Sequence, residues 1–309
     1  MRKPTFKQLQ AVSRIAELGT ITAAAAKLNL TASAISLTLK QIEKEAGLPL
    51  FELTESGLKT TEAGRAAVLA ESRIAAILAE LFETVSALKG STRGKVAFGV
   101  VSTAKYFAPF ILREFEKLHP RVEISLRVGN REDILARLED YTLDMALIGR
   151  PPLHIVVEKQ EIGPHPHVVI AAPDHPLARK RIVAASSLTN ETFLVREPGS
   201  GTRLLTERIL SEIGAIPKTG MEISSNETIK QAVMAGLGIS LLSYHTVSHE
   251  IGEGRLVALR VEGTPVIRKW YVVKNSKKQI LPSARSLWNF IATEGPRFLP
   301  PLKMAAVKR

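Results

Sequence analysis

The feature that most constrains this chain is a long Ala- and Leu-rich run from Glu62 to Gly90. It contains no proline or glycine between Arg65 and Lys89 and therefore predicts one continuous helix. Its apolar residues recur on a broad helical stripe, at Val68, Ile74, Ile77, Leu78, Leu81, Val85 and Leu88. A long helix beside a small domain often pairs with its own copy. We therefore expect dimerisation through residues 62–89; packing of this helix on its own chain is the alternative.

The helix separates two segments with different patterns. A chain of 309 residues is too long to fold around a single hydrophobic core, so two or three domains are expected. We expect a first domain at residues 1–61, a linker helix with a hinge at 62–92, and a further region at 93–309. The hinge is predicted at GSTRG, which follows the helix.

The segment before the long helix has a helical pattern. The run FKQLQAVSRIAELG places apolar residues on one face and ends at Gly19. Thr20 or Thr22 can cap a second, short helix, and Thr31 can cap a third that Gly47 closes. Two short helices joined by a tight turn describe a helix-turn-helix, with any small helical bundle as the alternative. The following run, LPLFELTESGLKTTEAG, predicts a two-stranded wing.

From Lys95 the pattern alternates between short apolar strands and amphipathic helices. This alternation predicts parallel sheets with helices on both faces. Its length suits two α/β subdomains with a ligand cleft between them, at the carboxyl ends of the strands. We expect lobe I at about 93–164 and 268–309 and lobe II at about 165–267.

The composition excludes several classes of protein. The chain has no cysteine, which removes disulfides, thiolate metal sites and cysteine nucleophiles. Its basic N-terminus has no apolar stretch behind it, so no secretory signal is expected. No apolar run reaches the roughly 18 residues that a membrane span needs, and we expect a cytoplasmic location.

The net charge is +12, from 42 lysines and arginines against 30 acidic residues. Such a balance favours polyanionic partners, with a generally basic surface as the alternative. Residues 1–64 carry 8 basic and 6 acidic side chains, whereas residues 93–309 carry 31 and 21. The excess lies in the C-terminal two thirds, so charge alone does not indicate nucleic-acid binding by the N-terminal domain.

Motifs for catalysis and for metal binding are absent or incomplete. The sequence contains no G-x-x-x-x-G-K-[ST], no G-x-G-x-x-G and no G-x-S-x-G. His245 and His249 have the spacing of a helical metal site but lack the glutamate of a zinc protease, and two surface histidines are the alternative. His165, His167 and His175 flank prolines in a predicted loop. We therefore expect no enzyme, no metal and no cofactor.

Several predicted strand-to-helix turns carry features that bind anions. The run VREPGSGTR, from Val195 to Arg203, either only turns the chain or holds an anion at a helix N-terminus. Backbone N–H groups at such an end carry partial positive charge. Similar turns are expected at Ser102-Thr103, Asn130, Ser200-Gly201-Thr202 and Asn226, near the basic side chains of Lys105, Arg131, Arg150, Arg196 and Arg203. Each turn alone reads as an ordinary helix cap, but four at the strand ends of one cleft favour an anion site.

The chain resembles the LysR-type transcriptional regulators. The run from Phe6 to Glu52 and the TTEAG that follows are similar to their winged helix-turn-helix. The long helix and the two-lobed effector domain are similar too, so the resemblance covers almost the whole chain. Within the family it looks most like the regulators of Calvin-cycle (Rubisco) operons, through VSTAKYFAP, VGNRE, GRPP, HVVIAAPDHPLA, FLVREPGSGTR, NETIKQAVMAGLGISLLS and WYVVK. The NETIK segment is widespread in the family, whereas VSTAKYFAP and FLVREPGSGTR together are far more specific.

The resemblance implies a fold, partners and a ligand. The fold is α/β with an N-terminal all-α winged helix-turn-helix, a long linker helix, and an effector domain of two α/β subdomains like those of type 2 periplasmic binding proteins. The partners are double-stranded DNA, further copies of the chain in a tetramer, and RNA polymerase. The ligand is a small anionic effector, either a phosphorylated metabolite or a nicotinamide nucleotide such as NADPH, bound non-covalently. The protein would activate carbon-fixation genes and repress its own.

The resemblance also implies which residues meet the effector. By position, the cleft would be lined by Ser102, Thr103, Asn130, Gly149, Arg150, Gly201 and Thr202. The neighbouring polar and basic residues complete the candidate set: Lys105, Arg131, Arg196, Ser200, Arg203 and Asn226. Arg203 or Arg196 would supply the counter-charge to an anion held by the N–H groups after Gly199.

The recognition-helix region departs from the family pattern. Thr31-Ala32-Ser33-Ala34 stands where most members have Ser-Gln-Pro-Ala. Ala32 cannot read a base edge as glutamine can, and Leu53 stands where most members have a basic residue near phosphate. We expect an altered operator or weak binding at physiological salt. The candidate DNA contacts are Arg14, Thr31, Ala32, Ser33, Ser36, Lys40 and Lys59.

Two other functions remain open at this point. One is a cytoplasmic anion-binding protein or enzyme on the same two-lobed fold, with a DNA-binding domain of weakened or altered specificity. The missing secretory signal and catalytic set count against it, and it would leave residues 1–90 without a role. The other is a protein interaction module with a decayed DNA-binding domain, suggested only by Ala32 and Leu53.

Overall fold

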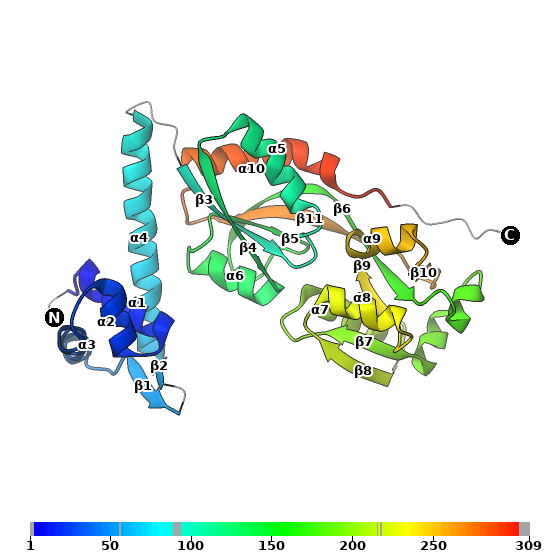
Figure 1. Ribbon diagram of the computed structural model, residues 1–309, viewed down its shortest axis with the longest axis horizontal. Helices are drawn as coiled ribbons and strands as arrows, with labels where there is room; N and C mark the ends of the chain where they lie inside the picture. The colour runs from blue at the N-terminus through cyan, green and yellow to red at the C-terminus, as the bar shows by residue number, and fades with distance from the viewer. Residues whose placement is uncertain (1–2, 56, 89–93, 215, 217, 303–309) are drawn as a thin grey trace. The chain divides into compact units, whose positions relative to one another are not determined.

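The computed structural model describes residues 3–55, 57–88, 94–214, 216 and 218–302 (Figure 1). The chain forms two compact units, one that reaches Val85 and includes Asp140–Thr142, and one made of residues 86–139 and from Leu143 onward. Residues 90–93 of the expected hinge lie outside the described part of the chain. None of the described helices is long and apolar enough to cross a membrane.

Three helices, α1 (Phe6–Leu18), α2 (Ile21–Leu28) and α3 (Ala32–Ala46), form the core of the first unit. Each begins at a threonine that accepts a backbone N–H and ends at a residue in the left-handed conformation: Thr5 and Gly19, Thr20 and Asn29, Thr31 and Gly47. Their buried faces meet around Val12, Ile15, Ala24, Ala25, Ile35 and Leu39. The predicted helix-turn-helix is therefore confirmed, with Thr20 rather than Thr22 as the cap.

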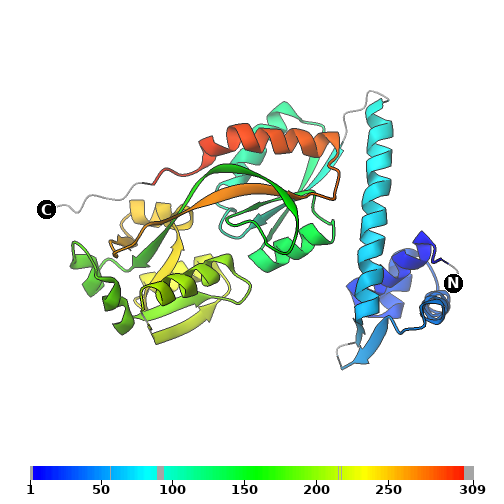
Figure 2. The ribbon, with the colours of Figure 1, turned by 180° about the vertical axis from the view of Figure 1, so that it is seen from behind.

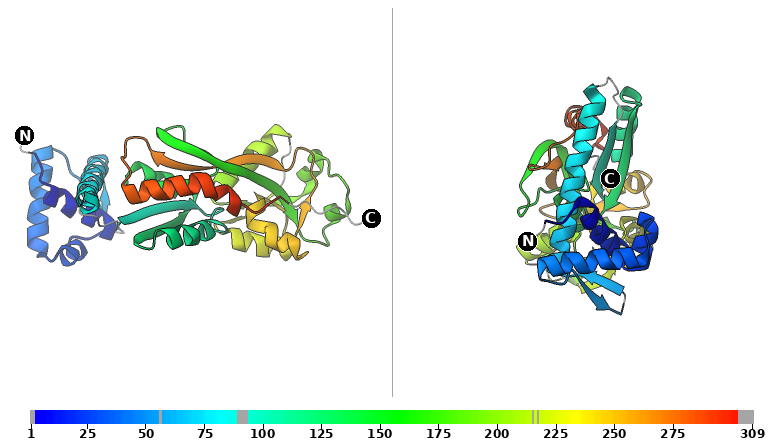
Figure 3. Two further views of the ribbon diagram at one scale, coloured as in Figure 1. Left: turned by 90° about the horizontal axis from the view of Figure 1, so that it is seen from above. Right: turned by 90° about the vertical axis from the view of Figure 1, so that its left-hand side faces the viewer.

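A two-stranded wing and a long helix complete this unit. Strands β1 (Phe51–Thr54) and β2 (Gly57–Thr60) pair antiparallel. The hydroxyl of Thr61 accepts the N–H of Gly64 at 3.1 Å and so caps α4 (Glu62–Leu88). Figure 3 shows α4 as one continuous helix. Its first turns pack on the core through Ala63, Ala67 and Val68, whereas most of the later stripe is exposed.

The second unit is built on a mixed seven-stranded sheet, in the order β10-β6-β11-β5-β3-β4 with β9 also on β6. Parallel pairing joins β3 (Gly94–Val101) to both β4 (Val122–Gly129) and β5 (Met145–Ile148). The long strands β6 (Val157–Ala171) and β11 (Val266–Asn275) pair antiparallel. Antiparallel neighbours of β6 are the short strands β9 (Ser240–Ser243) and β10 (Val257–Leu259). A separate parallel pair joins β7 (Thr192–Arg196) to β8 (Lys218–Ile223).

The prediction of parallel sheets is therefore wrong for the two longest strands. Both expected lobe boundaries, 164/165 and 267/268, fall inside β6 and β11, where His165 pairs with Arg268. The two strands run through both lobes, so residues expected in a loop, His165 and His167, lie in β6. The apolar core is nonetheless divided, with Ile162 and Trp270 in one cluster and Val169 and Val266 in another.

Six α-helices lie against the strands in the described part of the second unit. Lobe I carries α5 (Ala108–Leu118), α6 (Arg131–Glu139) and α10 (Pro282–Glu294), and Figure 2 shows α6 on the face of the sheet opposite to α5 and α10. Lobe II carries α7 (Gly201–Glu212), α8 (Asn226–Met234) and α9 (Tyr244–Gly252). Three short 3₁₀ helices complete the description: Pro176–Arg179, Ala185–Asn190 and Gly295–Phe298.

Candidate functional site

A cavity of about 260 Å³ lies at the carboxyl ends of the strands, between the two lobes of the second unit. Lobe I contributes the residues after β3, the start of α6 and the residues after β5. Lobe II contributes Ser200 and residues of α7 between Gly201 and Arg208, and the shared strands β6 and β11 contribute His165, His167 and Arg268.

Most of the candidate effector residues come together around this cavity. Nine line it: Ser102, Thr103, Asn130, Arg131, Gly149, Arg150, Ser200, Gly201 and Thr202. Four candidates do not: Lys105, Arg196, Arg203 and Asn226. Contrary to the prediction from the sequence, not all of these residues lie at helix N-termini. Ser102 and Thr103 lie in a turn that precedes α5 by several residues, and they cap no helix. Ser225, not Asn226, caps α8.

The PGSG loop both turns the chain and presents a helix end to the cavity. Gly199 has a φ of +81°, and a Cβ there would lie 2.5 Å from Oε2 of Glu132, so the turn requires glycine. The hydroxyl of Ser200 accepts the N–H of Thr202 at 3.3 Å and caps α7. The N–H of Glu132 donates to the carbonyl of Gly199 at 3.3 Å, which fixes the loop against lobe I. The partially positive end of α7 therefore faces the cavity.

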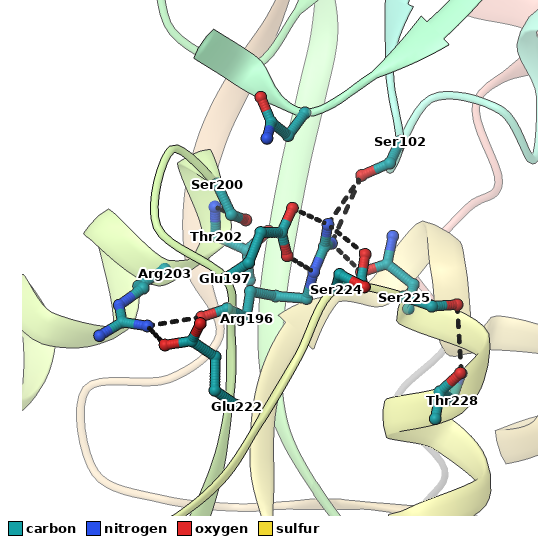
Figure 4. A network of polar contacts seen from close by, with 12 residues as sticks. Ser102, Arg196, Glu197, Ser200, Thr202, Arg203, Glu222, Ser224, Ser225 and Thr228 are labelled. Atoms are coloured by element: carbon teal, nitrogen blue, oxygen red, sulfur yellow. Dashed lines mark hydrogen bonds and ion pairs between the residues drawn. The ribbon is translucent and has the colours of Figure 1, made fainter. Parts of the chain in front are cut away.

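The two arginines expected as counter-charges are engaged elsewhere (Figure 4). Arg203 donates to Glu222 and to the carbonyl of Arg196, as Figure 4 shows. It also donates to Glu207. Arg196 binds both carboxylate oxygens of Glu197. Because both charges already have acidic partners, neither arginine is free to balance an anion in the cavity.

Four other arginines face the cavity instead: Arg131, Arg150, Arg208 and Arg268. None of the described residues that line the cavity is acidic. Burial and the nearby Arg150 lower the pKa of Arg131, and its buried Nε has no hydrogen-bond partner among the described residues. Burial, then repulsion from the other three arginines, lowers the pKa of Arg268 to about 10. The cavity therefore concentrates positive charge, and a bound anion would reduce both the repulsion between the arginines and the cost of burying them.

Sequence reasoning missed Arg208 and Arg268, although each had a signal. Arg208 lies seven residues after Gly201, which places both on one face of α7. Arg268 lies two residues before the buried Trp270 in β11, which indicates that both point to the same face of the strand. Its pairing with His165 required the antiparallel register of two distant strands. The apolar Leu153, Leu204 and Leu205 and the imidazole of His154 complete the lining that was not predicted.

A buried aromatic cluster supports the floor of the cavity. The ring of His165 stacks on Trp270 at 3.7 Å between centroids, and its Nε2 lies 3.0 Å from the Ser243 hydroxyl. Trp270 donates to Nδ1 of His245 at 3.0 Å, so His245 is a buried core residue and the interpretation of two surface histidines is wrong. His249 is exposed beside Glu253. No group of metal-ligating side chains occurs among the described residues.

Lowering the pH from 7 to 5 is expected to destabilise the fold through these histidines. Burial lowers the pKa of His165 far below 6.5, that of His167 to about 3 and that of His245 to about 4. Stability from the buried neutral rings is fully present above pH 6.5 and is lost as the pH falls toward 4. Each ring then costs roughly 1 kcal/mol per pH unit. Urea unfolding at pH 7, 6 and 5 measures this loss, and His167→Gln should make it shallower; an unchanged slope would contradict the assignment.

The first unit presents the candidate DNA contacts on and beside α3. Ala32, Ser33 and Lys40 are exposed along one side of this helix, with Ser36 half-buried between them. The cap residue Thr31 and the wing residue Lys59 are exposed too. Arg14 on α1 is paired with Glu17.

Leu37, also on α3, was not singled out from the sequence, yet 69% of it is exposed. An exposed leucine there offers an apolar contact of the kind that thymine methyl groups accept.

Comparison with known proteins identifies the family. The description "Bacterial regulatory helix-turn-helix protein, lysR family" matches residues 6–65, and "LysR substrate binding domain" matches residues 89–296. The chain belongs to the LysR family of DNA-binding transcriptional regulators.

Its relatives are named as regulators rather than enzymes. The HTH-type transcriptional regulator CbbR of Xanthobacter flavus is 47% identical over 96% of this chain and 90% of its own length. The RuBisCO operon transcriptional regulator of Allochromatium vinosum is 40% identical over 95% of this chain and 97% of its own.

Solved structures share the fold. The regulatory domain of Synechocystis CcmR, in complex with 2-PG, is 36% identical, with a TM-score of 0.63 over 65% of this chain and 97% of that domain. Full-length OxyR of Pseudomonas aeruginosa is 20% identical, with a TM-score of 0.70 over 95% of this chain and 96% of its own.

Proposed function

We propose that the cavity binds a small phosphorylated anion and that its occupancy changes how the N-terminal domain reads DNA. The observation that carries this proposal is the group of four arginines around a cavity without acidic lining, at the N-terminus of α7. Arginine and helix N-termini are the usual protein partners of phosphate and carboxylate oxygens. The roles of the individual lining residues belong to this proposal.

We propose further that the target genes serve carbon fixation and that the effector resembles 2-phosphoglycolate. The relative named as a RuBisCO operon regulator supports the target, and the CcmR domain in complex with 2-PG supports the effector class. A phosphorylated carboxylate carries several negative charges, which suits a cavity lined by four arginines and by no acidic residue among those described. A nicotinamide nucleotide such as NADPH remains the second candidate.

We also propose a role for each segment of the chain and self-association of the protein. Residues 1–61 would bind operator DNA, residues 62–89 would join two copies, and residues 93–309 would bind the effector. The exposed apolar stripe on α4 supports self-association. A tetramer, contact with RNA polymerase and a cytoplasmic location remain predictions from the sequence and the family resemblance.

The test is a footprinting titration of the full chain on the DNA upstream of its own gene. It is repeated with 2-phosphoglycolate, inorganic phosphate and NADPH. A protected site tens of base pairs long that shortens or shifts with one ligand is the expected result. Protection that no ligand changes would remove the effector from the proposal. No protection even at low salt would favour an anion-binding protein that has lost DNA reading.

Restoring the family residues on the DNA-binding surface is expected to tighten operator binding. Leu53 is 83% exposed on the wing, so Leu53→Arg adds a phosphate contact and steepens the log–log salt dependence by about 0.9. Ala32→Gln adds a base-reading amide without charge, so it should raise affinity but leave the salt dependence unchanged. Gel-shift titrations over a range of salt separate the two effects. Unchanged affinity in the double variant would sink the hypothesis that Ala32 and Leu53 weaken DNA binding.

A further inference from the structure

Arg196 is a buried arginine beside the cavity whose charge is already balanced. It is 3% exposed at the end of β7. Its Nε and Nη2 donate to the two carboxylate oxygens of Glu197 at 2.7 and 2.8 Å. This bidentate pair holds the guanidinium in one orientation. Its remaining donors are therefore aimed at fixed points.

Those remaining donors join the two lobes (Figure 4). Nη1 and Nη2 both donate to Oγ of Ser102, at 3.4 and 3.3 Å, and Ser102 belongs to lobe I. Nη1 also donates to Oδ1 of Asn226, and Nη2 to the carbonyl of Ser224 at 3.3 Å, both in lobe II. One side chain thus connects α8 and β7 with the turn after β3. Ser102 itself lines the cavity.

The pairing fixes what the Ser102 hydroxyl can do. A serine hydroxyl has two acceptor lone pairs and one O–H donor. Arg196 occupies the acceptor side through one N–H of Nη1 and through an N–H of Nη2 that it shares with the carbonyl of Ser224. The O–H is left as a donor only, and the adjacent positive charge polarises it. A ligand group that meets Ser102 must then be an acceptor, as phosphate and carboxylate oxygens are.

We propose that Arg196 is a positioning residue that makes Ser102 a dedicated donor to an anionic group of the effector. Because Arg196 lies in lobe II and Ser102 in lobe I, this donor is complete only when the lobes are closed on each other. Anion binding and lobe closure therefore reinforce one another. The inference rests on the proposed function of the cavity and adds to it a residue that does not touch the ligand.

The test is a double-mutant cycle on the full chain, with 2-phosphoglycolate as the probe in calorimetric titrations. Ser102→Ala should weaken binding about 10- to 100-fold, the range for a hydrogen bond to a charged group. Arg196→Lys, which keeps the charge but cannot chelate Oγ, should weaken it about tenfold. The double variant should bind within about twofold of Ser102→Ala, because Arg196 acts through that hydroxyl. The control is Arg203→Lys, which alters a neighbouring arginine outside the cavity lining and should leave affinity unchanged.

The outcomes separate this inference from the proposed function. Losses that multiply in the double variant would show that Arg196 does not act through Ser102 and would overturn the inference. A wild-type protein that binds neither 2-phosphoglycolate nor inorganic phosphate would overturn the proposed function and the inference with it. Thermal unfolding checks that each variant is folded. If Arg196→Lys is not, the charge-neutral replacement Arg196→Gln/Glu197→Gln takes its place in the cycle, with the same expectation of no added loss.

Discussion

Replacing Arg268 by methionine is expected to weaken binding of a phosphorylated metabolite by about 10- to 100-fold without destabilising the ligand-free protein. Arg268 projects from β11 into the cavity, beside three further arginines and no acidic lining residue. Burial and repulsion from these arginines lower the pKa of Arg268 to about 10, so its charged form destabilises the ligand-free protein. Methionine removes the repulsion and keeps an unbranched side chain, while the anion loses a charged hydrogen-bond donor.

Calorimetric titration with 2-phosphoglycolate measures the affinity, and denaturant unfolding measures the stability. Arg203→Met is the matched control, because Arg203 lies near the same cavity but is held by Glu207 and Glu222 outside its lining. Its affinity should change less than twofold. Equal losses in the two variants would mean that bulk charge, not the cavity, attracts the ligand. Full affinity in Arg268→Met would remove Arg268 from the binding site.

Placing glutamates on the exposed stripe of α4 is expected to dissociate the protein and weaken operator binding by more than about 100-fold. Ile77 is 64% exposed, Leu81 55% and Phe82 68%. With Ile74, Leu78 and Val85 they follow the spacing of one helical face. If a second copy of the chain covers this stripe, as we propose, Ile77→Glu/Leu81→Glu would place repelling charges within the contact. A dimer that binds two DNA half-sites at once has a far higher affinity than a monomer that binds one half-site. Loss of the dimer therefore lowers the affinity for DNA.

Sedimentation and gel-shift titration measure the two effects together. Ala79→Glu adds one such charge to α4 away from the stripe and should leave both the dimer and the DNA affinity unchanged. A double variant that remains dimeric would show that this face packs elsewhere. A variant that becomes monomeric yet binds DNA as before would break the link between assembly and DNA reading.

Features set by neighbouring residues were predictable from the sequence. The helix-turn-helix was found because Thr20, Thr31, Gly19 and Gly47 determine their helix ends by local hydrogen bonds and backbone freedom. The loop at Ser200 was found for the same reason, since its hydroxyl caps the helix it precedes.

Features set by distant pairing were not predictable in this way. The antiparallel register of β6 and β11 brings Arg268 beside His165 and buries histidines that prolines had suggested were in a loop. Proximity in sequence also misled, because Arg196 and Arg203 flank the PGSG loop but are neutralised by Glu197, Glu207 and Glu222. An acidic residue that is distant in the sequence can be recognised as the partner of an arginine only after the fold has placed the two side by side.

The most direct test of the central claim is a crystal structure of the full chain with 2-phosphoglycolate. We predict phosphate and carboxylate density inside the cavity, within hydrogen-bond distance of the backbone N–H groups at the start of α7 and of two or more of the four arginines. Ligand bound outside this cavity, or held in it without any contact to those arginines, would contradict it.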